Sequence, residues 1–259
     1  MPRLTHHQYN ELLKTELVKF LFGQDHQESV VVHKGFAAYH SEFFAGSVSK
    51  SGFEGTIELT DVGVNAVKIF ARWCYESRLD APVLQKLSPD QAQELKHSLI
   101  DVWIFAEMHG IPKLQNQSMS QLRSLFSHDL TLLTAEDIQF VFDKTSSVDN
   151  PLRQMLVLIL VVKIDLGREK FDKYDAIAQA HAGFFATFFT YQRTWLMAHG
   201  KAKPKDKAEK LVEMLEDEGM VAKVRVRVPP PPEWVLVLSG ATPQPQPQPQ
   251  KEGEVIELD

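Results

Sequence analysis

Helix-start signals recur through the middle of this 259-residue chain and constrain its fold more than any other feature. Ser88-Pro89-Asp90-Gln91 combines an N-cap serine, a proline at the first helical position and a glutamine three residues after the cap. Further starts lie at Ile111-Pro112, Thr134 and Asn150-Pro151, and Gly110 supplies a left-handed stop. The middle of the chain is therefore predicted to be a succession of helices.

The first 75 residues show a mixed pattern of strands and helices. Apolar residues at helical spacing predict a short amphipathic helix from Thr5 to about Glu16. β-Branched and aromatic residues then predict a hairpin of strands 18–22 and 29–33 around a turn at Gly23. The remaining expected elements are a helix over Lys34 to Ser47, a third short strand over Thr56 to Leu59 and a helix over Val64 to Tyr75. Local connections of this kind indicate an α+β fold.

The C-terminal half begins with helices and ends in a biased composition. The apolar run 152–164 predicts a core helix, and Asp172 to His199 predicts a long aromatic-rich helix. Beyond Gly200 come lysines, a short helical pattern and an alternating segment, Val221 to Val228, that predicts a half-buried strand. The repeat Pro243 to Gln250 indicates extended polyproline II.

Charge, cysteine content and hydropathy exclude several classes of protein. The formal net charge is -6 with both signs well mixed, which disfavours nucleic acid as a partner. Cys74 is the single cysteine, so an internal disulfide is excluded, and the N-terminus lacks the apolar core of a secretory signal. The apolar stretch Met155 to Val162 is less than half the roughly 20 residues that cross a bilayer. We expect an intracellular protein of the cytoplasm or nucleus with no membrane contact.

No motif for catalysis is present. The chain lacks a Gly-rich phosphate loop, a G-x-S-x-G elbow and an H-E-x-x-H pair, and its ten histidines show no metal-ligand spacing. Cys74 lies on the apolar face of an aromatic helix and is expected to be buried, while His33 is expected to bond backbone at a strand end. The lysines from Lys201 to Lys210 read as a solvated linker, with a nuclear import or phosphate-binding patch as the alternative. We expect no enzyme and no cofactor.

Four short segments, taken in order, resemble the BTB/POZ signature. Val32-His33-Lys34 is followed after six residues by Ser41-Glu42-Phe43-Phe44, similar to a strand ending at His-Lys and a helix ending at Ser-x-x-Phe. Ile57-Glu58-Leu59 with Asp61 resembles that fold's third strand and next helix start, and Arg72-Trp73-Cys74-Tyr75 resembles its helix ending at tyrosine. The segment from Ala106 to Leu114, with Pro112 at its turn, is similar to the following pair of helices. The signature positions are His33, Lys34, Ser41, Phe44, Asp61, Tyr75 and Pro112.

The resemblance covers about Val18 to Phe126 and implies a division of the chain. The BTB/POZ-like small sheet with a helical cluster is placed at 18–126. The residue patterns on either side give an N-terminal amphipathic helix at 1–17, an all-α extension at 127–199 and a charged, Pro/Gln-rich, largely disordered low-complexity tail at 200–259. Asn150-Pro151-Leu152-Arg153 is similar to a segment that follows the domain in many fungal members. The predicted core residues of the domain are Phe36, Phe43, Phe44, Phe70, Trp73, Leu99, Trp103 and Leu114.

The resemblance implies an adaptor or scaffold that binds other proteins and forms a homo-oligomer through its N-terminal stretch. Many members deliver substrates to a cullin-type ubiquitin ligase, but Gly52-Phe53-Glu54-Gly55 lacks the hydrophobic-x-Glu element that cullin-binding members usually carry. A second hypothesis is a transcription- or chromatin-associated regulator in which the segment from Lys201 to Arg227 touches nucleic acid.

The extreme C-terminus carries a separate interaction motif. Val255, Ile256, Glu257 and Leu258 resemble a SUMO-interacting motif, in which an extended peptide adds to the edge of a sheet. Pairing of this segment with Val221 to Val228 is the alternative within the chain.

Overall fold

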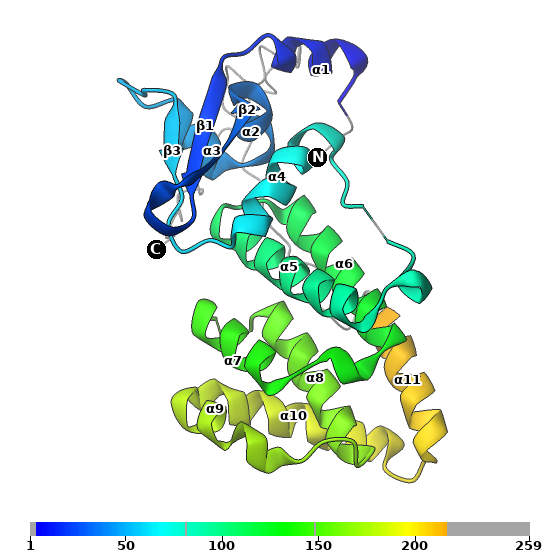
Figure 1. The fold of residues 1–259 in the computed structure, drawn as a ribbon. Helices are drawn as coiled ribbons and strands as arrows, with labels where there is room; N and C mark the ends of the chain where they lie inside the picture. Colours follow the sequence, from blue (N-terminus) through cyan, green and yellow to red (C-terminus); the bar gives the residue numbers. More distant parts are fainter. Residues whose placement is uncertain (1–3, 81, 148, 217–259) are drawn as a thin grey trace, which may run out of the picture.

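A computed structural model describes residues 4–80, 82–147 and 149–216, and shows a mostly helical α+β protein with one small sheet (Figure 1). The sheet and the first helices form one end of the molecule, and the later helices form the other. The strands are β1 (Leu17–Phe22), β2 (Glu28–His33) and β3 (Thr56–Glu58). The α-helices are α1 (His6–Leu13), α2 (Lys34–His40), α3 (Glu42–Val48), α4 (Val64–Glu76), α5 (Pro89–Met108), α6 (Pro112–His128), α7 (Ala135–Lys144), α8 (Pro151–Asp165), α9 (Asp175–Ala180), α10 (Ala182–His199) and α11 (Pro204–Glu216). Short 3-10 helices are η1 (Gln24–His26), η2 (Leu84–Lys86), η3 (Leu130–Leu132) and η4 (Phe171–Tyr174).

The sheet has the order β2-β1-β3 and mixed pairing. The β1–β2 hairpin is antiparallel, with Val18 opposite Val32 and Lys19 opposite Val31, whereas β3 runs parallel to β1 with Phe20 opposite Ile57. Gly23 turns the hairpin with a φ of 80°, a left-handed value that favours glycine. The predicted hairpin and third strand are therefore present, with bounds that differ by one residue.

One face of the sheet is buried against α2, α3 and α4. Phe20 lies at the centre of this first cluster, with its ring 5.0 Å from that of Phe44 and 6.0 Å from that of Phe70. Cys74 is completely buried among these side chains, and burial raises the pKa of its thiol. The cysteine is a packing residue, as its place on an apolar helix face predicts.

Helix α5 lies between two hydrophobic clusters. Val102, Phe105 and Ala106 belong to the first, whereas Leu99 and Trp103 belong to a second, which extends to Leu211. The predicted core of residues 18–126 is therefore divided, because two of its expected members pack with later helices. The domain boundary at 126 stays a prediction.

Helix α8 is the central element of the second cluster. From Leu152 to Lys163 every residue except Gln154 is buried, as expected for a helix that is apolar on all sides. The predicted core helix is present. No helix within residues 4–80, 82–147 and 149–216 has the length and apolar character needed to cross a bilayer.

The helix predicted over Lys34 to Ser47 is wrong in one respect, because it is broken at Ser41. Ser41 has an extended backbone with φ -142° and ψ 123°, and its hydroxyl accepts the Phe44 amide at 3.1 Å as the N-cap of α3. The break turns Phe43 outward. Its side chain is 50% exposed, so its assignment to the core is also wrong.

The long helix predicted over Asp172 to His199 is wrong and forms η4, α9 and α10 instead. His181 interrupts it with φ -126° and ψ 93°. The imidazole Nε2 of His181 lies 3.0 Å from the Asp143 carboxylate, and its ring packs on Phe142. Contacts to α7 thus stabilise an extended residue where periodicity alone predicts a continuous helix.

The short helical pattern expected after Gly200 is present as helix α11, but the helix begins earlier, at Pro204 among the lysines, and packs on the second cluster where a charged tail was expected. Leu211 is completely buried there. Lys207 is 8% exposed and donates to Asp165 at 2.8 Å, and the indole of Trp195 donates to the same carboxylate at 2.8 Å. Lys207 therefore contradicts the reading of these lysines as a solvated linker. The predictions for Val221 to Val228, Pro243 to Gln250 and Val255 to Leu258 lie outside the described residues.

Candidate functional site

The signature residues His33 and Tyr75 meet at one edge of the first cluster. The Tyr75 hydroxyl accepts the His33 amide at 3.1 Å and lies 3.0 Å from His33 Nδ1. The two rings lie edge to face, 5.9 Å apart, and burial raises the Tyr75 pKa. The expected backbone partner for the His33 side chain is therefore wrong, since a tyrosine hydroxyl takes that role. This contact connects the end of β2 to the last turn of α4.

Ser41 and Phe44 form a second pair, at the end of α5. The Ser41 hydroxyl donates to the His109 carbonyl at 2.6 Å, and the Phe44 ring stacks on His109 with centroids 5.1 Å apart. His109 Nδ1 in turn lies 2.8 Å from the Phe105 carbonyl, and burial lowers the His109 pKa. The sequence identified His109 only as part of a turn, yet its ring organises this contact.

The other signature positions lie apart from these pairs. Lys34 places its ammonium 5.9 Å from the Phe53 ring, and Pro112 occupies the first turn of α6 as predicted. Asp61 is exposed with φ 56° and does not cap the next helix, because Gly63 is the N-cap of α4. Gly63 allows the Asp101 side chain to approach closely, because a Cβ there would lie 2.5 Å from the carboxylate. The seven signature positions therefore support the scaffold at several points and do not converge on one pocket.

His40 is buried beside α4 in the first cluster, and the sequence analysis did not identify it. Its Nε2 donates to the Cys74 carbonyl at 2.9 Å, and its ring lies 4.6 Å from that of Trp73. Burial lowers its pKa to about 4, and Lys113 adds a repulsive charge. The folded protein therefore holds this imidazole neutral.

We expect this histidine to make stability depend on pH. Below about pH 6.5 the unfolded chain binds a proton that folded His40 does not accept until about pH 4, so stability is lost as the pH falls between these values. The loss attributable to His40 is roughly 3 kcal/mol. Urea denaturation of the native chain and His40→Gln from pH 7.5 to 4 measures it, since glutamine retains a donor without titrating. Equal pH slopes for the two proteins would contradict this assignment.

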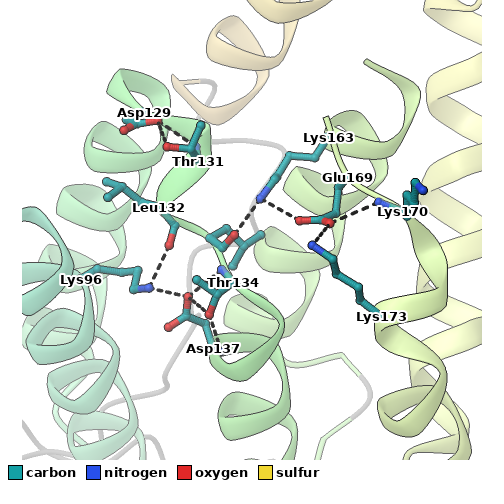
Figure 2. A network of polar contacts seen from close by, with 11 residues as sticks. Lys96, Asp129, Thr131, Leu132, Thr134, Asp137, Lys163, Glu169, Lys170 and Lys173 are labelled. Atoms are coloured by element: carbon teal, nitrogen blue, oxygen red, sulfur yellow. Dashed lines mark hydrogen bonds and ion pairs between the residues drawn. The ribbon is translucent and has the colours of Figure 1, made fainter. Parts of the chain in front are cut away.

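A network of buried charges connects α5, α7 and α8 (Figure 2). The Lys96 ammonium on α5 donates to Asp137 at 2.5 Å and to the Leu132 carbonyl at 2.8 Å. Asp137 also accepts the Thr134 amide at 2.8 Å, which completes the capping box at the start of α7. Lys96 is 0% and Asp137 2% exposed at the side chain, so each charge depends on the other for compensation.

Lys163 on α8 binds the other side of the same turn. Its ammonium donates to the Leu133 carbonyl at 2.7 Å and lies 3.5 Å from Glu169, which also pairs with Lys173 at 2.8 Å (Figure 2). The adjacent carbonyls of Leu132 and Leu133 are thus held by lysines from two helices. This arrangement fixes the η3–α7 turn between the two halves of the second cluster.

Arg153 and Asn150 complete the buried polar contacts at the start of α8. The Arg153 guanidinium donates to Thr145 Oγ1 at 2.7 Å and to the Phe142 carbonyl at 2.8 Å, with its centre 4.4 Å from the Phe142 ring centroid. Asn150 caps α8 and donates to Glu107 of α5 at 2.9 Å, and burial raises the Glu107 pKa. The segment Asn150 to Arg153 therefore ties the helical extension to α5.

Two surface hollows are present near these elements. One, of about 690 Å³, lies between the α1–β1 connection, the start of α2 and the loop before β3, with Lys34, Lys50 and Phe53 in its lining. The other, of about 530 Å³, lies between α4, α5 and α6, beside Arg72 and Leu95. Neither of these two hollows is lined by the buried Lys96–Asp137 pair. In the part of the chain that the structure describes, no three His, Cys, Asp or Glu side chains gather closely enough to hold a metal ion.

The outer face of the sheet is the more suitable contact surface. Leu17 and Val31 are 54% and 55% exposed, and both point away from the first cluster on adjacent strands, with Lys19 between them. Apolar side chains exposed on adjacent strands are a candidate contact surface, whereas singly scattered ones are ordinary. No model of a known protein family, no curated protein and no solved structure matches this chain.

Proposed function

We propose that the chain is a non-enzymatic protein-interaction module of the BTB/POZ type that pairs with itself and presents surfaces to other proteins. The observation that carries the proposal is the contact of signature residues far apart in sequence: His33 with Tyr75, and Ser41 and Phe44 with His109. The element order supports it as well, because a hairpin, a helical segment, a third short strand and then further helices follow each other as the resemblance implies.

Self-association through the outer face of the sheet is the first expected consequence. Replacing both Leu17 and Val31 by serine removes apolar area from both copies of a symmetric contact. We expect the dimer to weaken by roughly 3 kcal/mol, on the order of a hundredfold in the dissociation constant. Sedimentation velocity over a range of concentrations measures the change.

Val83→Ser is the matched control, since Val83 is equally exposed at 55% but lies near η2. Deletion of residues 1–16 is a harsher test, because it also removes Leu12 of α1, which is completely buried and packs closely against Gly35 of α2. A native chain that stays monomeric at all concentrations, or a dimer unaffected by the double substitution, would exclude this interface.

The adaptor role is tested by affinity purification with mass spectrometry, using the native chain and the Leu17→Ser/Val31→Ser chain as paired baits. An adaptor is expected to enrich a specific partner protein reproducibly. Recovery of only the bait from the native cell would count against the role.

A further inference from the structure

Helix α10 has an apolar stripe beside its buried face. Phe184, Phe188 and Trp195 face the second cluster and are at most 3% exposed. The stripe consists of Phe185, Phe189, Leu196 and Met197, which are 37%, 56%, 45% and 78% exposed. Phe185 and Phe189 are one helical turn apart and their rings stack 5.8 Å apart, Leu196 lies two turns beyond Phe189, and Met197 is turned about 100° from Leu196.

Helix α10, which carries the stripe, lies at the end of the molecule away from the sheet (Figure 1). The stripe extends over thirteen residues, from Phe185 to Met197, or about 18 Å of helix. Exposed Arg193 lies within it and adds a single positive charge. Large contiguous apolar patches are uncommon on soluble proteins and mark contact sites.

We propose that residues 234–238 of the same chain, Trp-Val-Leu-Val-Leu, lie in an extended conformation across the α10 stripe. This segment is outside the described residues. Five consecutive apolar residues with high β-propensity are an aggregation hazard unless they are covered. In extended form they span about 17 Å, close to the length of the stripe. Glu233 precedes them and provides a carboxylate for Arg193.

The connection is long enough for this contact. Residues 217–233 separate the end of α11 from Trp234, and 17 residues reach at most about 56 Å. The path back along α11 is about 20 Å long, and the path along α10 adds at most about 27 Å, so the linker is long enough to cover both. A flexible tether of this length gives an effective concentration in the millimolar range, so the chain's own segment outcompetes a second copy at micromolar protein.

Tryptophan fluorescence tests the proposal with the full chain. Three of the four tryptophans, Trp73, Trp103 and Trp195, are at most 1% exposed, so the fraction accessible to acrylamide reports on Trp234. We expect Trp234 to be protected in the native chain. The double substitution Phe189→Ser/Met197→Ser removes apolar area that docking would bury, so it is expected to lower the docking equilibrium constant by roughly tenfold or more. Trp234 should then become accessible to the quencher.

Two controls make the result specific. Val83→Ser removes an equally exposed aliphatic side chain elsewhere and should leave the protection of Trp234 intact. Each variant is also measured with Trp234→Phe added, and the quenching of the remaining tryptophans, Trp195 included, is subtracted. Equal, unrestricted quenching of Trp234 in the native and stripe-altered chains overturns the proposal. Protection that disappears on dilution assigns the stripe to the segment of a second copy and overturns the intramolecular contact.

Discussion

Replacing Lys96 with methionine is expected to lower the free energy of unfolding by roughly 3 to 5 kcal/mol. The ammonium and the Asp137 carboxylate are both buried and 2.5 Å apart, so removing the cation leaves the carboxylate only its Thr134 hydrogen bonds and the exposed His97 imidazole, whose Nε2 lies 3.2 Å away. Such a loss is far larger than that of an exposed ion pair. Chemical denaturation at neutral pH, followed by far-UV circular dichroism, measures the change.

Two further variants distinguish loss of the buried pair from loss of a lysine. Lys86→Met alters an exposed lysine and is expected to change stability by no more than about 0.5 kcal/mol. Lys96→Met with Asp137→Leu removes both charges and should recover most of the loss, less about 1 kcal/mol for the capping box at Thr134. A Lys96→Met protein within about 1 kcal/mol of the native chain would contradict the assigned role of the pair.

Truncating Trp103 to alanine is expected to destabilise the protein by roughly 3 to 5 kcal/mol. The side chain is completely buried on α5 in the second cluster, so the substitution leaves a large cavity between α5 and later helices. The midpoint of urea unfolding, converted with the native m-value, gives the loss.

Trp103→Phe is the matched comparison for this cavity. The Trp103 indole nitrogen has no hydrogen-bond partner among the residues that the structure describes, so phenylalanine loses ring volume without breaking a polar contact seen there. We expect a loss of about 1 to 2 kcal/mol, well below that of alanine. Unchanged stability of Trp103→Ala would place this residue outside the core.

Local signals were sufficient to predict much of the fold. Capping boxes form at Thr5, Ser88 and Thr134, and Asn150 and Pro112 begin their helices where the sequence places them. These features depend on side chains within three residues of the helix start, so a single sequence contains the necessary information. The hairpin followed for the same reason, from two β-branched runs around one glycine.

The candidate site was less accessible, because its contacts connect distant residues. His33 and Tyr75 are 42 positions apart, and Lys96 and Asp137 are 41 apart. One signal for the buried charges was present: Lys96 shares a helical face with Leu99 and Trp103, and Lys163 follows an uninterrupted apolar run. A charge within an apolar stripe indicates a buried partner without identifying it. The break at Ser41 and the outward turn of Phe43 likewise depend on the distant carbonyl of His109.

The second cluster also determines when the protein can finish folding during synthesis. Its members extend from Leu99 to Leu211, so α5 and α6 retain apolar surface after the ribosome has completed residue 126. Translation of the next 90 residues or so, up to the end of α11, takes roughly 5 to 18 seconds at the usual rate of about 5 to 20 residues per second. During that interval the nascent sheet-bearing half is vulnerable to misassembly and is a natural client for chaperones.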